Sequence, residues 1–131
     1  MKPQELRLGN FIADKIYKTP MWIVSMGLDD KRDAYLYLEF DGNNGDVWEN
    51  YIDEITPLLI NDNDNLLERF GFVYDEPTGK WLALKKTETI YLKRNGNAYD
   101  VYTRGYNAMH EVVEYIHELQ NVVFDKLGIV L

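Results

Sequence analysis

Two histidines and a glutamate near the C-terminal end have the residue types of a metal site. His110, Glu114 and His117 follow one another at intervals of four and three residues. On the helix that the surrounding apolar pattern predicts, these intervals place all three side chains on nearly one face. Two imidazoles and a carboxylate are a ligand set for iron or zinc. The triad would therefore belong to a carboxylate- and metal-dependent enzyme.

The geometry of that helix argues against a shared ion. The rise of a helix separates the Cα atoms of His110 and His117 by about 10 Å along the axis, whereas a zinc–nitrogen bond is only about 2 Å long. Either neighbouring pair would need further ligands, and the chain has no third histidine and no cysteine. We therefore expect both histidines to flank the apolar stripe and to hydrogen-bond with Glu114 or solvent. The sequence predicts no metal, no cofactor and no catalytic residue.

Other motifs of catalysis and ligand binding fail on their spacing. Ser25 is the only serine, and it stands within MWIVSMGL rather than in a GxSxG elbow. Neither GxGxxG nor GxxxxGK occurs. The run NDNDN resembles a calcium loop, but Leu66 and Leu67 occupy its fifth and sixth positions when Asp62 is the first. The sequence therefore leans towards a protein that is not an enzyme.

The composition is that of an acidic protein with enough apolar residues for a core. The 131 residues are 46% hydrophobic and 14% aromatic, and the formal net charge is −8 with a pI near 4.7. This charge repels a phosphate backbone, so we do not expect nucleic acid as a partner. No apolar run has membrane-spanning length, the opening MKPQELRLGN lacks a signal-peptide core, and cysteine is absent. We expect a cytoplasmic protein without a membrane partner.

Short strands separated by turns fill the first sixty residues. The segments with strand patterns are ELRLGNFI (5–12, with a kink at Gly9–Asn10), MWIVSMGL (21–28), AYLYLEF (34–40), VWENYI (47–52) and EITPLLI (54–60). The glycines and asparagines of DGNNGD, residues 41–46, tolerate positive φ and predict a hairpin turn. These elements predict a small curved β-sheet or SH3-like barrel from Met1 to about Ile60.

The second half alternates between helical and strand patterns. A short helix over residues 61–70 is followed by a meander of FVYD (72–75), WLALKK (81–86), TIYLKR (89–94) and AYDVYT (98–103). A final amphipathic helix is expected from an Asn107 cap to about Leu127, with Gly128 ending it. The fold class is therefore α+β: one domain over residues 1–131, whose β-rich lobe (about 1–60) and helix–meander–helix lobe (about 61–131) share a core.

Basic and aromatic residues gather in the meander. Between residues 80 and 104, six Lys or Arg stand against two Asp or Glu, a balance of +4. Because side chains alternate along a strand, we predict a solvent face with four candidate partner-binding residues: Trp81, Lys85, Tyr91 and Lys93. The opposite face would place four apolar residues beneath the final helix: Leu82, Leu84, Ile90 and Leu92. Single-strand nucleic-acid binders have a similar mixture, but the net charge favours a protein partner.

Three segments spread over the chain resemble a known family. They are ELRLGNFI, then ITPLLI leading into NLLERFGF, then YIHELQNVVFDKLG. Their order and spacing are similar to those of small proteins without an established activity from gut Bacteroidales and their phages or integrated elements. Asn65 stands where that family has tryptophan, and Glu118 stands where it has glutamine. The resemblance implies a small α+β protein of a phage or mobile element and assigns no catalytic residue.

These observations favour a non-enzymatic protein-binding or adaptor module whose partner is another protein. Two alternatives stay open. One is the carboxylate- and metal-dependent enzyme, and the other is an acidic DNA mimic that inhibits a host defence protein, which the charge and the resemblance both suggest. The sequence predicts no particular oligomeric state.

Overall fold

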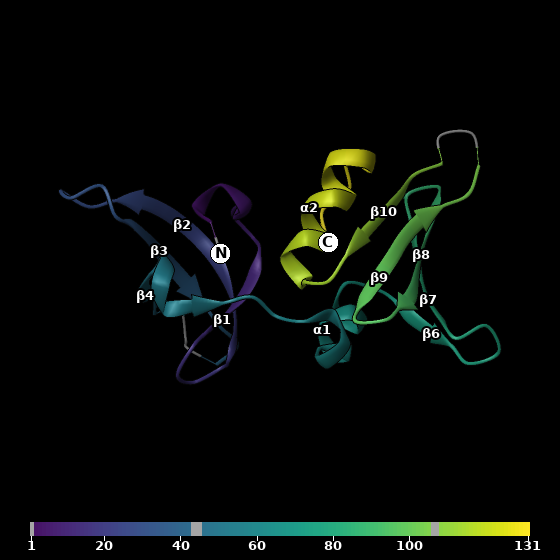
Figure 1. Ribbon diagram of the computed structural model, residues 1–131, viewed down its shortest axis with the longest axis horizontal. Helices are drawn as coiled ribbons and strands as arrows, with labels where there is room; N and C mark the ends of the chain where they lie inside the picture. The colour runs from purple at the N-terminus through teal and green to yellow at the C-terminus, as the bar shows by residue number, and fades with distance from the viewer. Residues whose placement is uncertain (1, 43–45, 106–107) are drawn as a thin grey trace. The chain divides into compact units, whose positions relative to one another are not determined.

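Two five-stranded antiparallel sheets account for most of the regular structure (Figure 1). The computed structural model describes residues 2–42, 46–105 and 108–131. The chain divides into two compact units, Met1–Leu58 and Leu59–Leu131. Strands with a few helices give the α+β class that the sequence predicts. The predicted boundary between lobes lies two residues later, and a core shared by both lobes stays a prediction.

The first unit is a sheet with the strand order β4-β3-β2-β1-β5. Its strands are β1 (Phe11–Asp14), β2 (Pro20–Leu28), β3 (Ala34–Glu39), β4 (Trp48–Tyr51) and β5 (Ile55–Thr56), with 3-10 turns η1 (Pro3–Glu5) and η2 (Ile52–Glu54). The predicted turn at 41–46 includes residues 43–45, which lie outside the described residues. β4 and β5 are the two edges of an open sheet, so the predicted barrel is not confirmed.

Alternating side chains build the core of this unit. β3 buries Leu36 and Leu38 and leaves Tyr35 and Tyr37 half-buried, as expected for a sheet with one wet face. The core cluster consists of Leu6, Ile12, Met21, Ile23, Leu36, Leu38 and Ile55. β1 is shorter than predicted and begins at Phe11. Gly9 has φ +85°, and the Asn10 Oδ1 accepts the Arg7 N–H at 2.8 Å, so a turn replaces the start of the expected strand.

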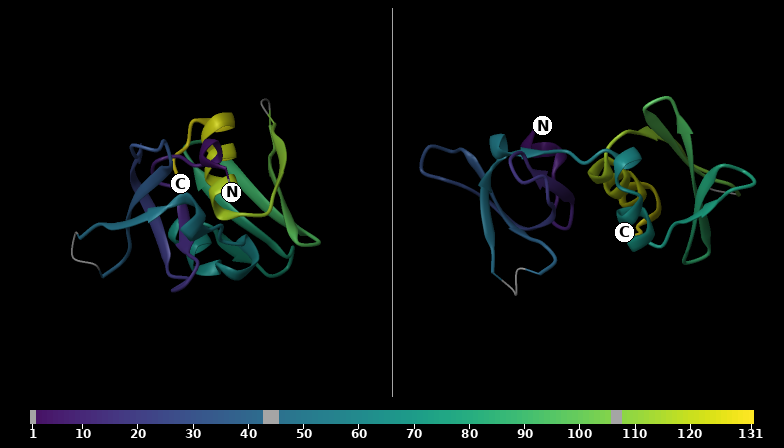
Figure 2. Two further views of the ribbon diagram at one scale, coloured as in Figure 1. Left: turned by 60° about the vertical axis from the view of Figure 1, so that its left-hand side comes forward. Right: turned by 90° about the horizontal axis from the view of Figure 1, so that it is seen from below.

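The second unit is a meander with the order β10-β9-β8-β7-β6, to which two helices are added. Its elements are η3 (Ile60–Asp62), α1 (Asp64–Arg69), β6 (Val73–Asp75), β7 (Lys80–Lys85), β8 (Glu88–Asn95), β9 (Ala98–Thr103), β10 (His110–Val113) and α2 (Ile116–Leu127). Both helices lie on the same face of this sheet (Figure 1 and Figure 2). No helix in the described ranges has both the length and the apolar character that crossing a membrane requires.

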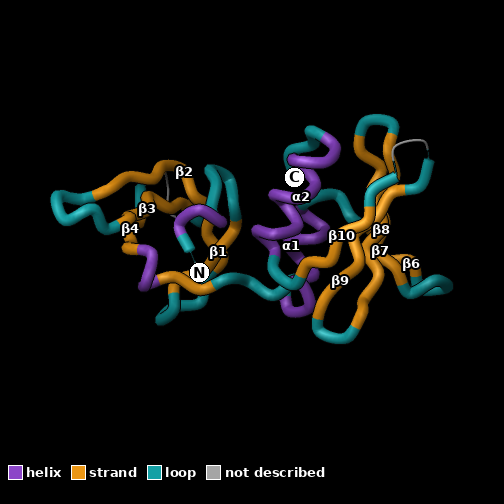
Figure 3. The backbone as a smooth tube through the Cα atoms, turned by 45° about the horizontal axis from the view of Figure 1, so that its top comes forward, coloured by secondary structure: helices purple, strands orange, loops and turns teal. Residues whose placement is uncertain are grey.

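Apolar residues of both helices complete the core of the second unit. α1 buries Leu66 and Leu67, and α2 buries Leu119 and Val123, opposite a sheet whose buried residues include Ile90, Leu92 and Val101. Gly128 ends α2 in the left-handed conformation, with φ 67° and its N–H donated to the Phe124 carbonyl at 2.8 Å. Figure 3 shows the helices in purple and the strands in orange along the backbone.

The predicted start of the last helix is wrong. Asn107 lies outside the described residues, and His110–Val113 form strand β10, which pairs with β9. Met109 and Val113 are both buried, and an interval of four residues fits one turn of helix as well as two repeats of a strand. The helix begins at Ile116 because the Glu118 Oε1 accepts the N–H groups of Glu114 and Tyr115, each at 3.0 Å.

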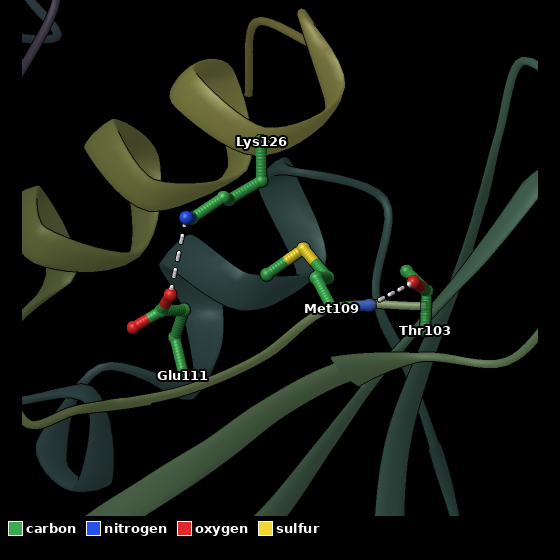
Figure 4. Close-up of polar contacts among 4 residues, drawn as sticks. All are labelled: Thr103, Met109, Glu111 and Lys126. Atoms are coloured by element: carbon green, nitrogen blue, oxygen red, sulfur yellow. Dashed lines mark hydrogen bonds and ion pairs between the residues drawn. The ribbon is translucent and has the colours of Figure 1, made fainter. Parts of the chain in front are cut away.

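Polar contacts of side chains connect α2 with β10 and β10 with β9 (Figure 4). The Lys126 Nζ of α2 lies 3.5 Å from the Glu111 Oε1 of β10. The Thr103 Oγ1 accepts the Met109 N–H at 3.1 Å, and this bond is buried. Thr103 also donates its own N–H to the Met109 carbonyl at 3.1 Å. This reciprocal pair holds the start of β10 against the end of β9.

Candidate functional site

The histidine–glutamate triad does not converge. His110 lies on β10 with a 65% exposed side chain, and its Nε2 is 3.4 Å from the Asp100 Oδ1. His117 lies on α2 and is only 2% exposed, with its ring stacked on Tyr115 at 5.9 Å between centroids. The expected placement of both imidazoles beside one helical stripe is therefore wrong. Within residues 2–42, 46–105 and 108–131, no group of three His, Asp or Glu side chains could hold a metal ion.

The four predicted surface residues lie on two different faces. Trp81 stands opposite Leu92, and Lys80 stands opposite Lys93. Trp81 is thus on the buried face, with 8% of its surface exposed. Lys85 shares that face by alternation, whereas Tyr91 and Lys93 belong to the outer one. The expectation of one shared solvent face is wrong, while the role of any of these residues in partner binding stays a prediction.

The turn between β7 and β8 explains this error. Lys85 pairs with Glu88, so only Lys86 and Thr87 form the connection. A two-residue turn places even-numbered residues of β7 opposite odd-numbered residues of β8. A shift of one residue moves every side chain of a strand to the other face. Leu82 and Leu84 therefore lie outside rather than beneath α2, and Leu84 is 73% exposed.

The outer face is centred on two stacked tyrosines. Tyr91 and Tyr102 are cross-strand partners, with ring centroids 5.0 Å apart and planes inclined by 10°. The Arg104 Cζ lies 4.7 Å from the centroid of Tyr91, and the Lys80 Nζ lies 5.4 Å from that of Tyr102. These distances are within the range of cation–π attraction. We call Lys80, Tyr91, Tyr102 and Arg104 the tyrosine–cation cluster.

The two cations change the acidity of the tyrosine beneath them. Burial raises the pKa of Tyr102, but hydrogen bonding and positive charge from Lys80 and then Arg104 outweigh it, and the net pKa is lowered. The Tyr102 hydroxyl therefore lies in a positive local field, although the protein as a whole is negative. Lys93 is exposed beside Lys80, while Asp75 stands opposite Lys80 and Asp100 stands opposite Lys93 on the same face. An anionic group would therefore be attracted to Tyr102 itself, where Lys80 and Arg104 lie.

Exposed apolar side chains lie on the same face. Val73 stands opposite Leu82 on the β6 side, and Val112 stands opposite Asp100 on the β10 side. Val73 is 69% exposed and Val112 is 58% exposed. Protein interfaces usually place apolar groups at the centre and polar groups at the rim, whereas this face has apolar groups at its edges and charged groups at its centre. The face can therefore offer apolar contact at both edges and positive charge at its centre.

The four predicted partner-binding residues include Tyr91 of this cluster but not Lys80, Tyr102 or Arg104, although all four belong to the basic and aromatic stretch of the meander. The sequence does contain a signal for the pairing of the two tyrosines. Asn95 pairs with Ala98 across the turn Gly96–Asn97, and such a turn is a strong hairpin signal. Counting outwards from that turn places Tyr91 opposite Tyr102.

Comparison of the chain with protein-family models, with curated proteins and with solved structures finds no match. The resemblance to the Bacteroidales and phage family therefore stays a prediction.

Proposed function

We propose that the chain is a non-enzymatic protein-binding or adaptor module, and that the outer face of its second sheet receives an acidic segment of another protein. The observation that carries this proposal is the tyrosine–cation cluster. Two cations lie over a stacked aromatic pair on the face opposite to α1 and α2.

The chemistry of the cluster suits recognition of carboxylates. Tyrosine and arginine are enriched among the residues that dominate binding energy. The rings already restrict Lys80 and Arg104, so less side-chain freedom is lost when a partner binds. Arg104 can hold a carboxylate through two parallel hydrogen bonds, and Val73 and Val112 supply apolar contact at the edges. An acidic peptide with apolar residues complements this arrangement.

The stack itself favours a peptide over single-stranded nucleic acid. Tyr91 and Tyr102 turn one ring face towards each other at 5.0 Å, and Lys80 and Arg104 lie within 6.0 Å of both rings. A base would have to displace these neighbours before it could stack. The net charge of −8 adds long-range repulsion.

We also propose that the protein acts in the cytoplasm and belongs to the mobile-element family that its three segments resemble. The return of β5 to pair with β1 supports an SH3-like arrangement of the first unit. The metal-dependent alternative gains no support, because His110 and His117 lie on different elements.

One observation favours the DNA-mimic alternative. A recess of the first unit is lined by five acidic residues, Asp29, Asp30, Asp33, Asp53 and Glu54, and by one basic residue, Lys31. A mimic would bind a basic partner through this recess rather than an acidic one through the second sheet. The two candidate functions therefore predict partners of opposite charge.

A selection from a displayed random-peptide library tests the proposal. We expect the wild-type protein to enrich acidic peptides that contain apolar residues. The double variant Lys80→Met, Arg104→Gln should bind the enriched peptides at least about tenfold more weakly by fluorescence anisotropy. Its unfolding free energy should fall by no more than about 1 to 2 kcal/mol, which is the cation–π attraction that the half-buried Lys80 and the exposed Arg104 lose. Binding should also weaken as salt is raised.

A matched control removes two positive charges elsewhere. The variant Lys2→Met, Lys31→Met carries the same net charge as the double variant and should bind like wild type. Equal binding by all three proteins would refute a role for the cluster. Enrichment of basic peptides would favour the DNA mimic, and tight binding of single-stranded homopolymers instead of peptides would favour nucleic acid.

A further inference from the structure

A second concave site lies within the first unit. It is a cavity of about 360 Å³ lined by Asp14, Tyr17, Thr19, Met21, Phe40 and Trp48. We call it the Trp48 pocket. Its volume is at the lower end of the range of small-molecule sites. The pocket can hold a small ligand or the end of a long side chain.

Aromatic rings form its walls. Tyr17 and Trp48 meet edge to face, with centroids 5.6 Å apart and planes inclined by 85°. Both residues keep exposed surface, 66% for Tyr17 and 38% for Trp48, while Phe40 is half-buried. The face of an aromatic ring carries partial negative charge. Two rings at right angles bound a corner with one face of each.

A buried carboxylate also lines this volume. Asp14 is 5% exposed. Its Oδ1 accepts the N–H groups of Ile16 and Tyr17 at 2.8 and 2.9 Å, and its Oδ2 accepts the Asn50 Nδ2 at 2.7 Å. The hydrogen bonds from Tyr17, then Asn50, and from Ile16 outweigh burial and lower the pKa of Asp14. All these donors are neutral, so the pocket retains a full negative charge.

Hydrogen bonds connect this charge to both walls. The Trp48 Nε1–H donates to the Asn50 Oδ1 at 2.8 Å, and Asn50 donates in turn to Asp14. The other oxygen of Asp14 fixes the backbone of the turn that carries Tyr17. The indole, the carboxylate and the turn are therefore positioned together before any ligand arrives.

We propose that the Trp48 pocket binds a methylated ammonium group, the chemistry that choline and trimethylated lysine share. Aromatic faces and a nearby carboxylate both attract a cation. A primary ammonium brings three N–H donors and a guanidinium brings five, whereas Asp14, with about four lone-pair sites, already accepts three hydrogen bonds from neutral donors. A quaternary ammonium brings no N–H donor and therefore leaves none unsatisfied. This site belongs to the other unit and does not depend on the function proposed for the second sheet.

Paired probes that differ only in charge test this inference on the full chain. Choline and its neutral isostere 3,3-dimethyl-1-butanol have the same shape, since a carbon atom replaces the nitrogen. We expect choline to shift the Trp48 indole N–H signal in NMR titrations and to bind at least about tenfold more tightly than the isostere. Equal affinity for the two probes, or no shift with either, would overturn the proposal.

Variants of Tyr17 locate the site. Tyr17→Leu keeps an apolar side chain but removes the ring, and it should abolish the preference for choline. Tyr17→Phe keeps the ring and should bind choline like wild type. Tyr74→Leu, an exposed tyrosine of the second unit, serves as the control for position. A preference that survives in Tyr17→Leu would show that the cation binds elsewhere.

Two further probes separate the natural sources of the group. A short peptide with one trimethylated lysine tests a protein source, and phosphatidylcholine vesicles test a lipid source. Competition of either probe with choline, lost in Tyr17→Leu, identifies the source and supports the proposal. If only free choline binds, the ligand is a small soluble cation, and the proposed chemistry still holds.

Discussion

The two sheets hold their charged groups in opposite ways. In the first, the carboxylate of Asp14 is buried and held by neutral N–H donors of a turn and of Asn50. In the second, Lys80 and Arg104 lie over tyrosine rings on the outer face. The buried charge fixes backbone, whereas the outer charges contact side chains. Substitutions of these charged groups should therefore affect mainly stability in the first sheet and mainly binding in the second.

Thr103, a buried polar residue of the second sheet, is neutral. The Thr103 hydroxyl accepts one N–H, that of Met109, while Asp14 accepts hydrogen bonds from Ile16, Tyr17 and Asn50. A charged acceptor forms stronger hydrogen bonds than a neutral one, and its loss leaves more donors unsatisfied. The contrast between the sheets is therefore one of charge and of the number of bonds, which substitution can measure.

The largest effect is expected for Asp14→Ala. This change leaves the N–H groups of Ile16 and Tyr17 and the Asn50 amide without their acceptor, and we expect the first unit to lose about 3 kcal/mol of unfolding free energy. Hydrogen exchange of amides in β1 and β2, measured at increasing urea concentration, gives the unfolding free energy of the first unit. Amides in β8 and β9 give that of the second unit. Asp30→Ala removes an exposed carboxylate as the control. A loss of unfolding free energy no larger than that of Asp30→Ala would contradict the proposed difference between the two sheets.

Acid should remove part of the same stabilisation. The pKa of Asp14 in the folded protein lies below its usual value of 3.8. Its contribution is therefore complete above that value and is lost as the pH falls through the folded pKa. We expect the stability difference between wild type and Asp14→Asn to be constant near neutral pH and to shrink below pH 3.8. The urea midpoints of both proteins are measured across this pH range. A difference between the two midpoints that does not change with pH would contradict the assignment.

Strands flanked by clear turns could be predicted from the sequence, because local periodicity determines them. The predicted segments around β2, β3, β7, β8 and β9 match the observed strands closely. β10 was missed because the interval between Met109 and Val113 fits both periods. The shared face was misjudged because the pattern of one strand does not specify its register with the next, which the turn Lys86–Thr87 sets.

The Trp48 pocket could not be predicted from the sequence. Its lining comes from the end of β1, the following turn, β2, the end of β3 and β4. Only the pairing of these strands brings Asp14 near Asn50, which lies 36 residues along the chain. An aspartate before a turn is also common for local reasons, since its side chain accepts nearby backbone N–H groups. Residue type therefore gave no sign that Asp14 lines a cavity.

The smallest of these effects is expected for Thr103→Val. Valine keeps the shape of threonine but leaves the buried Met109 N–H without the acceptor shown in Figure 4. We expect a loss of about 1 kcal/mol from the second unit, together with faster exchange of the Met109 amide. Thr89→Val makes the same change at a half-buried site on the outer face and should stay within about 0.5 kcal/mol of wild type.

The comparison between the two sheets then depends on the ratio of two losses of unfolding free energy, that of Asp14→Ala and that of Thr103→Val. If Thr103→Val destabilised its unit as much as Asp14→Ala destabilises the other, a neutral hydroxyl with one bond would equal a carboxylate with several. Charge would then not distinguish the two sheets, and the buried carboxylate would need no explanation beyond the turn that it holds. A clearly larger loss of unfolding free energy for Asp14→Ala would instead show that the first unit keeps a buried charge whose desolvation is unfavourable. That charge lines the Trp48 pocket, where it can attract a bound cation.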